Sequence, residues 1–455
     1  MMLFGTNGVR GKFDMLNPEL ALKLAKAIGR YFKCGKILVA RDGRLTGECL
    51  KHAVISGLES TGCDVVDLDC TSAPTAEFMI KKLKADGLVI VTASHNPPEW
   101  NALKVVDGNG ITISKERGEE IEKLMGTPAD EWRKVKPSTS YPNATKEHIE
   151  AILKHIDIDS IRKRRPKIVL DCGNGMAALI APQLFAELGC EIILLNEKVD
   201  GNFPGRPSEP TEANVEKLLH TVKKTKADGG IAWDGDCDRV IFVDEKGTFI
   251  VGDKVLALCE SLKLRKGNIL RAVVTTVATS KVVEDVATKY GCNTIYTKIG
   301  APYLSEEMLR SNAIIGGEEV GGVIWPELSL AKDGFLTGAK MAEMICEKRL
   351  SEWVEEIPAY FNEKTKIECN DEGKRKIVDG MMKYAKEKKL TTITVDGVRI
   401  NFPDSWVIVR ASGTENYVRV FAEAKTKEKA KQLMEEYRKI ALKNSVDYAH
   451  RSYLW

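Results

Sequence analysis

Residues 87–98 read Gly-Leu-Val-Ile-Val-Thr-Ala-Ser-His-Asn-Pro-Pro, and this stretch decides the fold. Its apolar, β-branched first half predicts a buried strand. Pro97 and Pro98 extend neither a strand nor a helix, so the chain must turn there. Ser94 therefore lies just past the carboxyl end of the strand, where open α/β sheets hold ligands. His95, Asn96 and the loop amides are placed to surround an anion at the Ser94 hydroxyl. A Ser or Asx turn that only ends the strand accounts for the same residues.

Strand and helix patterns alternate around this stretch. Apolar residues at helical spacing predict helices, and short apolar runs predict strands. The predicted elements cover 18–32, 37–40, 50–61, 65–68 and 116–125, and a helix with His148 and His155 follows. This alternation predicts an α/β unit over residues 1–150, followed by a basic run at 162–167 that resembles a linker or a solvated helix end.

Two further alternations follow and predict two more α/β units, over 151–250 and 251–363. Their predicted elements are 168–170, 178–188, 192–195, 230–233, 240–243, 272–276, 313–315 and a helical stretch that ends at Arg349. The three alternations are similar in size, which suggests a repeated domain, although no clear sequence repeat is present.

From about Lys364 the pattern changes, and the order of elements suits a small α+β domain over 364–455. Its predicted elements are a helix over 374–388, strands near 393, 407–409 and 417–420, and a helix over 427–441. At ~150 residues per domain, the length of 455 residues indicates three domains or four smaller ones.

The composition is that of an ordinary globular protein, with 43% hydrophobic and 29% charged residues. A net charge of +3 gives no support to nucleic acid or an anionic membrane as a partner. The first residues lack the basic and long apolar regions of a signal peptide, and no apolar run approaches the ~20 residues that span a bilayer. The eleven cysteines show no CxxC spacing, so we expect free thiols and a cytoplasmic location.

The second informative stretch is 233–239, Trp-Asp-Gly-Asp-Cys-Asp-Arg, between two predicted strands. The carboxylates of Asp234, Asp236 and Asp238 can converge on one cation, and all-oxygen ligands suit Mg²⁺ or Mn²⁺. A solvated, Asp-rich hairpin turn is the simpler explanation. Three aspartates at this spacing beside Arg239 favour the metal site.

The third stretch is 410–416, Arg-Ala-Ser-Gly-Thr-Glu-Asn, which continues a predicted strand and has Arg419 a little beyond. Backbone amides, the hydroxyls of Ser412 and Thr414, and bidentate guanidinium groups fit a phosphate dianion. Taken alone, a hairpin turn with surface arginines is the better explanation of these residues.

The fourth stretch is 316–322, Gly-Gly-Glu-Glu-Val-Gly-Gly, after an apolar run. Its glycines let the backbone approach a ligand closely, and the two acids can accept hydrogen bonds from sugar hydroxyls. A mobile glycine loop is the alternative.

One stretch suggests a different class of protein, a dinucleotide-dependent oxidoreductase. Residues 173–178, Gly-Asn-Gly-Met-Ala-Ala, follow a predicted strand and match G-x-G-x-x-A. Glu197 lies about 20 residues further on, where an acid binds the ribose in dinucleotide sites. On its own this pattern is weakly specific.

Together and in this order, 92–97, 234–239, 317–321 and 410–414 resemble the four signature loops of the α-D-phosphohexomutase superfamily. The opening 4–11, Phe-Gly-Thr-Asn-Gly-Val-Arg-Gly, is also similar to that family. The loops fall one in each quarter, so the resemblance covers essentially the whole chain. It implies an α/β fold of four domains around a central cleft. The first three would be similar, each with a mixed sheet between helices, and the last would be a small α+β domain.

The resemblance also implies roles for individual residues. Ser94 would carry a phosphate, and one Mg²⁺ would bind a phosphoserine oxygen together with Asp234, Asp236 and Asp238. Glu318 would contact sugar hydroxyls. The residues implied at the phosphoryl-transfer centre are Arg10, His95, Asn96, Lys104 and Arg239. The residues implied to hold the non-reacting phosphate of the substrate are Arg410, Ser412, Gly413, Thr414 and Arg419.

The implied reaction interconverts hexose 6-phosphates and hexose 1-phosphates, which are small-molecule substrates. Phosphoserine would give its phosphoryl group to the sugar, forming a hexose 1,6-bisphosphate that turns over in the cleft and also serves as an activator. Such chemistry depends mainly on positioning and charge neutralisation. Lys104 or His95 is expected as the general acid/base, and closure of the last domain is expected to exclude water.

Departures from the family pattern concern the sugar. Val320 stands where many relatives have Ser or Asn, so one sugar contact is missing. Gly322 and Ala301 stand where some relatives have His, and Lys298 is the basic residue expected to replace them. The resemblance therefore favours phosphomannomutase/phosphoglucomutase activity on mannose or glucose phosphates, with phosphoglucosamine mutase as the alternative.

A silent sugar-phosphate sensor is a third class, and Ser94 and the complete Asp set argue against it. The sequence leaves open which sugar is preferred. It also leaves the oligomeric state open, and a homo-oligomer is compatible with it.

Overall fold

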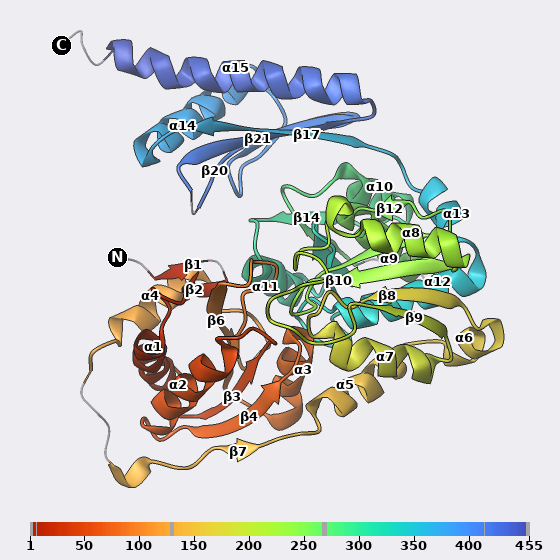
Figure 1. Ribbon diagram of the computed structural model, residues 1–455. Helices are drawn as coiled ribbons and strands as arrows, with labels where there is room; N and C mark the ends of the chain where they lie inside the picture. The colour runs from red at the N-terminus through yellow and green to blue at the C-terminus, as the bar shows by residue number, and fades with distance from the viewer. Residues whose placement is uncertain (1–2, 6, 128–131, 266–270, 414, 452–455) are drawn as a thin grey trace.

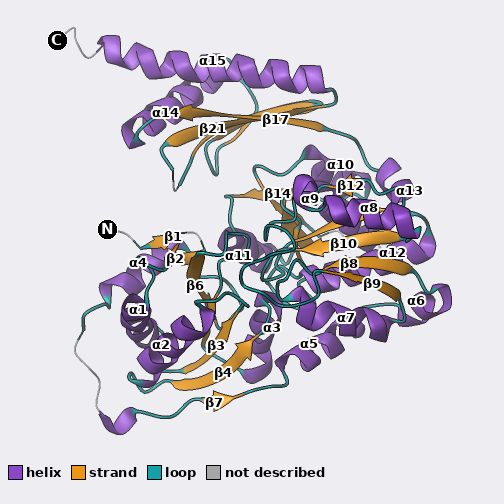
Figure 2. Cartoon of the chain, viewed as in Figure 1, coloured by secondary structure: helices purple, strands orange, loops and turns teal. Residues whose placement is uncertain are grey.

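The computed structural model describes residues 3–5, 7–127, 132–265, 271–413 and 415–451. These residues form four sheets, each with its own helices (Figures 1 and 2). The first three sheets are mixed and the fourth is antiparallel, so the predicted class, three α/β domains and a small α+β domain, is confirmed.

Domain I contains a seven-stranded sheet in the order β1-β2-β6-β5-β3-β4-β7. Its strands are β1 (Phe4–Gly5), β2 (Gly8–Lys12), β3 (Lys36–Arg41), β4 (Asp64–Cys70), β5 (Gly87–Val91), β6 (Trp100–Asp107) and β7 (Thr139–Ser140). Its helices are α1 (Pro18–Tyr31), α2 (Gly47–Glu59), α3 (Ala73–Leu83) and α4 (Lys115–Lys123), with a 3₁₀ turn at Trp132–Lys134. Strand β5 is buried on both faces, because Val89 and Val91 enter one apolar core and Leu88 and Ile90 enter another. This explains its continuous apolar sequence.

Domain II contains a five-stranded sheet in the order β12-β11-β10-β8-β9. Its strands are β8 (Lys167–Asp171), β9 (Glu191–Leu195), β10 (Gly229–Trp233), β11 (Val240–Asp244) and β12 (Phe249–Ile250). Its helices are α5 (Ala144–Leu153), α6 (Ile158–Arg164), α7 (Ala177–Leu188) and α8 (Glu216–Thr225), with a 3₁₀ turn at Glu212–Asn214.

Domain III contains a four-stranded sheet in the order β14-β13-β15-β16. Its strands are β13 (Val273–Thr276), β14 (Thr294–Thr297), β15 (Ile315–Glu318) and β16 (Gly322–Ile324). Its helices are α9 (Gly252–Leu264), α10 (Lys281–Lys289), α11 (Ala301–Ser311), α12 (Gly334–Glu347) and α13 (Leu350–Glu355). Domains II and III share one large apolar core, which includes Trp233 and Trp325.

Domain IV contains a five-stranded antiparallel sheet in the order β17-β21-β20-β19-β18. Its strands are β17 (Phe361–Glu368), β18 (Thr392–Ile393), β19 (Val398–Phe402), β20 (Ser405–Ala411) and β21 (Tyr417–Ala424). Helices α14 (Asp371–Glu387) and α15 (Lys427–Arg451) lie together on one face of the sheet (Figure 2). This domain has its own apolar core and meets domain III through a smaller cluster that includes Val277 and Trp406.

The first three domains repeat one arrangement of strands, and this repeat places the site. In each, a central strand pairs in parallel with two neighbours, and the second neighbour pairs with an antiparallel strand. The repeated sets are β4-β3-β5-β6, β9-β8-β10-β11 and β14-β13-β15-β16. The loops after β5, β10 and β15 are therefore equivalent positions in three copies of one unit, and they carry three of the four stretches singled out in the sequence.

Most predicted elements are confirmed within a few residues, and the differences have local causes. The helix predicted to carry His148 and His155 ends at Leu153, and the backbone N–H of His155 donates to Ile152 O in a turn. The strand predicted over 313–315 begins only at Ile315, because Ala313 N donates to Met308 O and closes the end of α11. The basic run at 162–167 covers the last turn of α6, as expected for a solvated helix end. In the described part of the chain, no helix is long and apolar enough to cross a membrane.

Candidate active site

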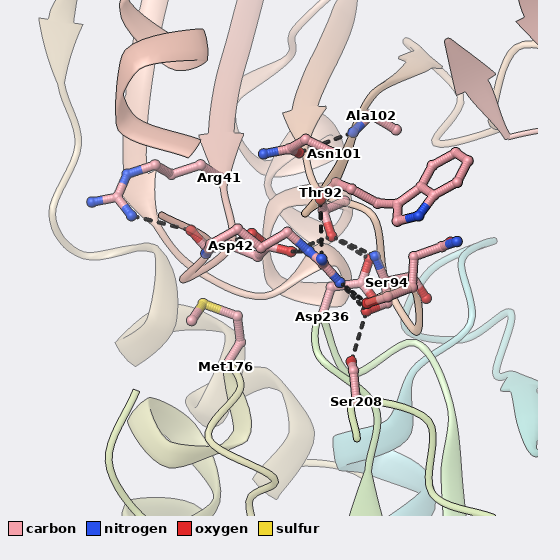
Figure 3. Close-up of polar contacts among 12 residues, drawn as sticks. Arg41, Asp42, Thr92, Ser94, Asn101, Ala102, Met176, Ser208 and Asp236 are labelled. Atoms are coloured by element: carbon pink, nitrogen blue, oxygen red, sulfur yellow. Dashed lines mark hydrogen bonds and ion pairs between the residues drawn. The ribbon is translucent and has the colours of Figure 1, made fainter. Parts of the chain in front are cut away.

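Ser94 lies beyond the end of β5 in a left-handed backbone conformation, with φ of 50°. Such a conformation costs a non-glycine residue about 1–3 kcal/mol, so its surroundings must hold it. The buried guanidinium of Arg44 donates to four carbonyl oxygens of this loop, at distances of 2.6–3.0 Å: those of Ser94, Asn96, Pro97 and Trp100. The hydroxyl of Ser208 in domain II donates to Ser94 O at 2.8 Å (Figure 3). The loop is therefore fixed from two domains.

The Ser94 loop and the Asp loop of domain II are joined by hydrogen bonds. The Thr92 hydroxyl lies 2.7 Å from Asp42 Oδ2 and 2.9 Å from Asp236 Oδ2 (Figure 3). The Ser94 hydroxyl donates to Asp234 Oδ2 at 2.6 Å. A Cβ atom at Gly235 would come within 2.7 Å of Ser94 O, so only glycine allows this close approach.

Asp234, Asp236 and Asp238 converge in the loop between β10 and β11. One carboxylate oxygen from each lies within 4.8 Å of the others, and all three residues are buried. Burial, and then repulsion by the other two carboxylates, raises the pKa of Asp234. Asp236 Oδ1 and Asp238 Oδ1 are buried with no hydrogen-bond partner among the described residues. Unpaired buried carboxylate oxygens are costly, and this all-oxygen donor set fits a hard divalent cation such as Mg²⁺.

Two lysines lie on the other side of Asp238. Lys104 Nζ, from β6, is 2.8 Å from Glu77 Oε1 and 4.0 Å from Asp238 Oδ2. Lys332 Nζ is 3.0 Å from Asp238 Oδ2 and 2.6 Å from Glu318 Oε1. Burial alone would raise the pKa of Asp238, but Lys332 and Lys104 lower it. The charges of the pocket therefore form one connected network.

Sequence reasoning missed Lys332, and the structure explains how it enters the site. Asp333 caps the N-terminus of α12, and Gly334 N donates to Cys237 O of the Asp loop at 3.2 Å. Lys332 thus enters the pocket just before the helix. A Cβ atom at Gly322 would lie 2.3 Å from Lys332 Cδ, so the glycine at 322 provides the space for this lysine. The sequence signal that could have identified Lys332 is its position immediately before the helix cap Asp333.

The remaining pocket residues predicted from the sequence come from strand β2, the Ser94 loop and the Asp loop. Arg10 donates to Asn96 Oδ1. Arg239 donates its backbone N–H to Asp234 Oδ1 and its Nη1 to Glu209 Oε1, both at 3.1 Å. His95 Nδ1 is 3.4 Å from the Ser94 hydroxyl. Burial, then the charges of Arg239 and Arg10, lowers the pKa of His95 to about 3, so this imidazole is neutral at pH 7.

These groups enclose a small cavity of about 20 Å³. It is lined by Asn7, Arg10, Thr92, Ser94, His95, Lys104, Asp236, Asp238, Arg239 and Lys332. A space of this size holds about one water molecule or one ion. A sugar phosphate must therefore approach from outside the cavity.

The loop after β15 reaches the same region. Val240 N donates to Gly321 O at 3.1 Å, which ties this loop to the start of β11. Gly321 has φ of 87°, and a Cβ atom there would lie 2.1 Å from Val240 O. Glu318 is buried beside Lys332, whereas Val320 is partly exposed. Lys298 lies apart from the cavity, with Nζ 5.2 Å from the centre of the Tyr303 ring.

The fourth stretch forms the hairpin between β20 and β21 in domain IV. Arg410 pairs with Asp396, with 3.0 Å between Nη2 and Oδ2. Arg419 donates to the Tyr417 hydroxyl at 2.8 Å. Ser412 Oγ accepts from Glu415 N at 3.1 Å, and a Cβ atom at Gly413 would meet nothing within 4 Å. Thr414 lies outside the described residues.

Arg410 and Arg419 stand directly opposite each other on β20 and β21, and Lys366 stands opposite Arg419 on β17. Opposed residues of antiparallel strands share a face, and like charges there destabilise the pair. Both Arg410 Nε and Arg419 Nε are buried with no hydrogen-bond partner among the described residues. This row of cations fits an anion. Sequence reasoning missed Lys366, because only the register of β17 places it here.

Other parts of the protein fill the space around residues 173–178, where the sequence suggested a dinucleotide site. A Cβ atom at Gly173 would meet the Arg206 guanidinium at 2.5 Å, and one at Gly175 would meet the backbone of Gly235 at 2.7 Å. Met176 N donates to Gly235 O at 2.9 Å. These glycines therefore serve the packing of the Asp loop, and the space that a pyrophosphate needs is filled.

Comparisons with known proteins agree along most of the chain. Family models of phosphoglucomutase/phosphomannomutase match in order: α/β/α domain I over 1–131, domain II over 146–247, domain III over 251–361 and the C-terminal domain over 363–440. A phosphoglucomutase/phosphomannomutase of Thermococcus kodakarensis is 42% identical over 447 residues, with 95% of this chain and 97% of that protein covered. A phosphoglucosamine mutase of Methanocaldococcus jannaschii is 36% identical over 445 residues, with 95% and 97% covered.

A solved structure of a phosphoglucomutase/phosphomannomutase family protein from Burkholderia thailandensis shares the fold, with a TM-score of 0.86 and 26% identity. The match covers 97% of each chain. The strand repeat, the buried Asp set beside Ser94 and these matches lead to one conclusion: the chain belongs to the phosphoglucomutase/phosphomannomutase family, whose members are phosphohexomutases and thus isomerases.

Proposed function

We propose that the protein interconverts hexose 6-phosphates and hexose 1-phosphates through a phosphoserine at Ser94, with mannose and glucose phosphates as its preferred substrates. The observation that carries this proposal is the position of the Ser94 hydroxyl. It lies 2.6 Å from Asp234 in a buried set of three carboxylates, and basic side chains surround it. Carboxylates that can hold a cation, beside basic side chains, are the groups that phosphoryl transfer requires.

Asp234, Asp236 and Asp238 are the residues that would hold one Mg²⁺, together with an oxygen of phosphoserine. A bound Mg²⁺ would neutralise phosphoryl charge and orient the transferred group. The carboxylate oxygens without partners support this assignment. Arg10, Arg239, Lys104 and Lys332 would offset the charge of the phosphoryl oxygens, which is about −1.5 to −2 for a phosphoserine.

In the transfer step, the bond between phosphorus and Ser94 Oγ breaks and a bond between phosphorus and a sugar oxygen forms. The sugar hydroxyl loses a proton, and Ser94 Oγ gains one. His95 is the candidate general acid/base nearest to the reacting oxygen, since its Nδ1 lies 3.4 Å from Ser94 Oγ. The negative charge of a bound phosphoryl group would raise the pKa of His95 from about 3 toward neutral pH, where proton transfer is most efficient. Lys104 is held in an ion pair with Glu77, which raises its pKa although burial alone would lower it. It therefore suits charge neutralisation better than proton transfer.

The phosphate that does not react would bind in domain IV. Arg410, Arg419, Ser412 and Gly413 form this loop, and Thr414 belongs to the same stretch of sequence. A phosphate would relieve the opposition of the two arginines by accepting charge-assisted hydrogen bonds from their guanidinium groups. Asn96 would contact the substrate from the Ser94 loop. Closing domain IV over the sugar would exclude water from the phosphoserine.

Sugar recognition would come from the loop after β15 and from Lys298. Glu318 would accept hydrogen bonds from sugar hydroxyls, and its position is fixed by Lys332. The apolar Val320 offers no side-chain hydrogen bond, which favours a site with few polar contacts to the sugar. Glucosamine phosphates are the alternative substrates, since several similar proteins are named phosphoglucosamine mutases. A hexose 1,6-bisphosphate would act as the primer that phosphorylates Ser94.

We further propose domain boundaries of 1–150, 151–250, 251–363 and 364–455, which keep the first three sheets intact and fall within α5 at 150/151 and within β17 at 363/364.

The decisive experiment compares kcat/KM for the phosphates of mannose, glucose and glucosamine, with Mg²⁺ and the matching hexose 1,6-bisphosphate present. We expect turnover of mannose and glucose phosphates and weaker turnover of glucosamine phosphates. A preference for glucosamine phosphates would establish the alternative. No turnover of any hexose phosphate would contradict the proposal and favour a sugar-phosphate sensor.

A further inference from the structure

One carboxylate joins the phosphate loop of domain IV to domain III. Asp396 Oδ2 pairs with Arg410 Nη2 at 3.0 Å, and the same oxygen accepts a hydrogen bond from Ile299 N at 3.2 Å. Ile299 follows Lys298 in the loop between β14 and α11. Figure 1 shows the hairpins of domain IV facing β14. A single side chain thus contacts a phosphate-binding candidate and the backbone beside a sugar-binding candidate.

The hairpin that carries Asp396 is held firmly in place. Gly397 has φ of 77°, and a Cβ atom there would lie 2.5 Å from Val409 O and 2.6 Å from Arg410 Cβ. Only glycine allows this turn to pack so closely against β20. This close packing places Asp396 beside Arg410. The position of Asp396 is therefore a property of the turn and does not depend on a flexible side chain.

Two residues further along, Arg399 anchors the same hairpin to domain III. Its buried guanidinium donates to Val277 O at 2.8 Å and to Thr279 O at 3.1 Å. It also lies over the rings of Tyr296 and Trp406, at 4.6 and 4.2 Å from their centres. Because Arg399 fastens the hairpin to domain III, Asp396 faces Arg410 from a fixed support.

Within the described structure, the pairing leaves part of the Arg410 guanidinium without a hydrogen-bond partner. Asp396 contacts Nη2, whereas Nε is buried with no hydrogen-bond partner among the described residues. A guanidinium is planar, so fixing one edge fixes the direction of its other N–H groups. The carboxylate therefore orients the donors that remain for a phosphate.

We propose that Asp396 is a positioning residue, which directs Arg410 toward the substrate phosphate and couples the phosphate loop to the 297–300 loop of domain III. This inference rests on the proposed function for the identity of the phosphate. It adds to that function a defined connection between the distal phosphate and the loop that carries Lys298. A phosphate arriving at Arg410 meets a guanidinium that is already oriented.

The test compares Asp396→Asn with Asp404→Asn, which makes the same chemical change in the exposed turn between β19 and β20. We expect Asp396→Asn to raise KM for glucose 1-phosphate about tenfold and to change kcat less than about threefold, which corresponds to weakening one charge-assisted hydrogen bond. Asp404→Asn should leave both constants unchanged. Asp396→Ser serves as a second variant if the first does not fold.

A double-mutant cycle separates positioning from general damage to the domain. In an Arg410→Ala background, Asp396→Asn should have no further effect on KM, because the group that it orients is gone. Additive effects in the cycle would overturn the proposal, as would an unchanged KM in the single variant. A lower KM would also overturn it, because Asp396 would then compete with phosphate for Arg410.

Calorimetric titration with inorganic phosphate tests the inference separately from the mutase reaction. The loss of phosphate affinity from wild type to Arg410→Ala measures how much of the phosphate binding depends on this loop. Asp396→Asn should lose most of that share, and Asp404→Asn should lose none of it. If the wild-type protein turned over no hexose phosphate, the proposed function would fail, and this titration would still decide the role of Asp396.

Discussion

The two proposed anion sites of this protein are built in different ways. The pocket around Ser94 takes its walls from domains I, II and III, and its charged groups pair with one another before any ligand arrives. The phosphate loop of domain IV belongs to a single hairpin, and it opposes Arg410 and Arg419 across two strands. The first site brings three aspartates together with the basic side chains that surround them. In the second, Arg410 and Arg419 each pair with one carboxylate, Asp396 and Glu415, and Lys366 adds a further positive charge beside them.

This difference predicts which residues control the chemical step and which control substrate affinity. Side chains of the Ser94 pocket should control kcat, because they touch the transferred phosphoryl group. Side chains of the phosphate loop should control KM, because they hold the part of the substrate that does not react. Each variant below tests one side of this contrast.

The largest effect is expected from Ser94→Ala, which removes the atom that would carry the phosphoryl group. Mutase activity should fall by at least about 10⁴-fold, as when a nucleophile is removed. Circular dichroism should show an unchanged fold, because Arg44 and Ser208 bind the backbone of residue 94 and not its side chain. Normal turnover in this variant would show that catalysis does not need the Ser94 hydroxyl, and it would contradict the role given to the Ser94 pocket.

The next effect is expected from removal of the metal. Treatment with EDTA should lower kcat by about a thousandfold, or about 4 kcal/mol in the barrier, and Mg²⁺ should restore it. Mg²⁺ at about 100 times its Kd should also raise the free energy of unfolding by about 2.7 kcal/mol. Thermal unfolding measures this shift.

Asp236→Asn is the matched control for the metal, since it keeps the size of the side chain and removes its charge. The variant should lose most of the Mg²⁺-dependent rise in Tm. An equal rise in the variant and the wild type would place the metal elsewhere.

A smaller effect, and one of a different kind, is expected from Arg410→Ala. KM for glucose 1-phosphate should rise about 10- to 100-fold, the range for a lost hydrogen bond between charged groups, whereas kcat should fall less than tenfold. Steady-state kinetics separates the two constants. A large fall in kcat with an unchanged KM would remove the distinction between the two sites.

The smallest effect is expected from Val320→Ser, which adds a hydroxyl to the partly exposed loop beside Glu318. One neutral hydrogen bond to the sugar should shift the ratio of kcat/KM values for glucosamine and mannose phosphates about two- to tenfold toward glucosamine. Competition assays with both substrates measure this ratio. A ratio that does not move would show that Val320 lies outside the sugar site.

The sequence was sufficient for the features that depend on local patterns. The apolar run before Ser94, the alternate aspartates and the glycines around Glu318 each mark a strand that ends in a loop, and the structure has strands at those positions. The strand repeat of the first three domains was only suggested by the similar sizes of the alternations. Its proof needed the antiparallel pairing of β6, β11 and β16.

Other site features depend on contacts between distant residues, and the sequence did not reveal them. Lys332 reaches the pocket because α12 begins against the Asp loop and Gly322 leaves room for it. Lys366 aligns with Arg419 only through the register of β17, and Asp396 meets Arg410 only through a tight turn. The pattern at Gly173 suggested a dinucleotide site that the described residues do not form. Glycines that suit a pyrophosphate also suit the close packing of two loops.

The central claim is that Ser94 both gives and takes back a phosphoryl group. Its most direct test uses hexose 1-phosphate labelled in the phosphate, followed by peptide mapping of the protein and a chase with unlabelled substrate. The account predicts one labelled peptide, with the label on Ser94, and loss of the label to sugar phosphate at the rate of turnover. A protein that turns over substrate without label on Ser94, or with label that the chase does not remove, would contradict it.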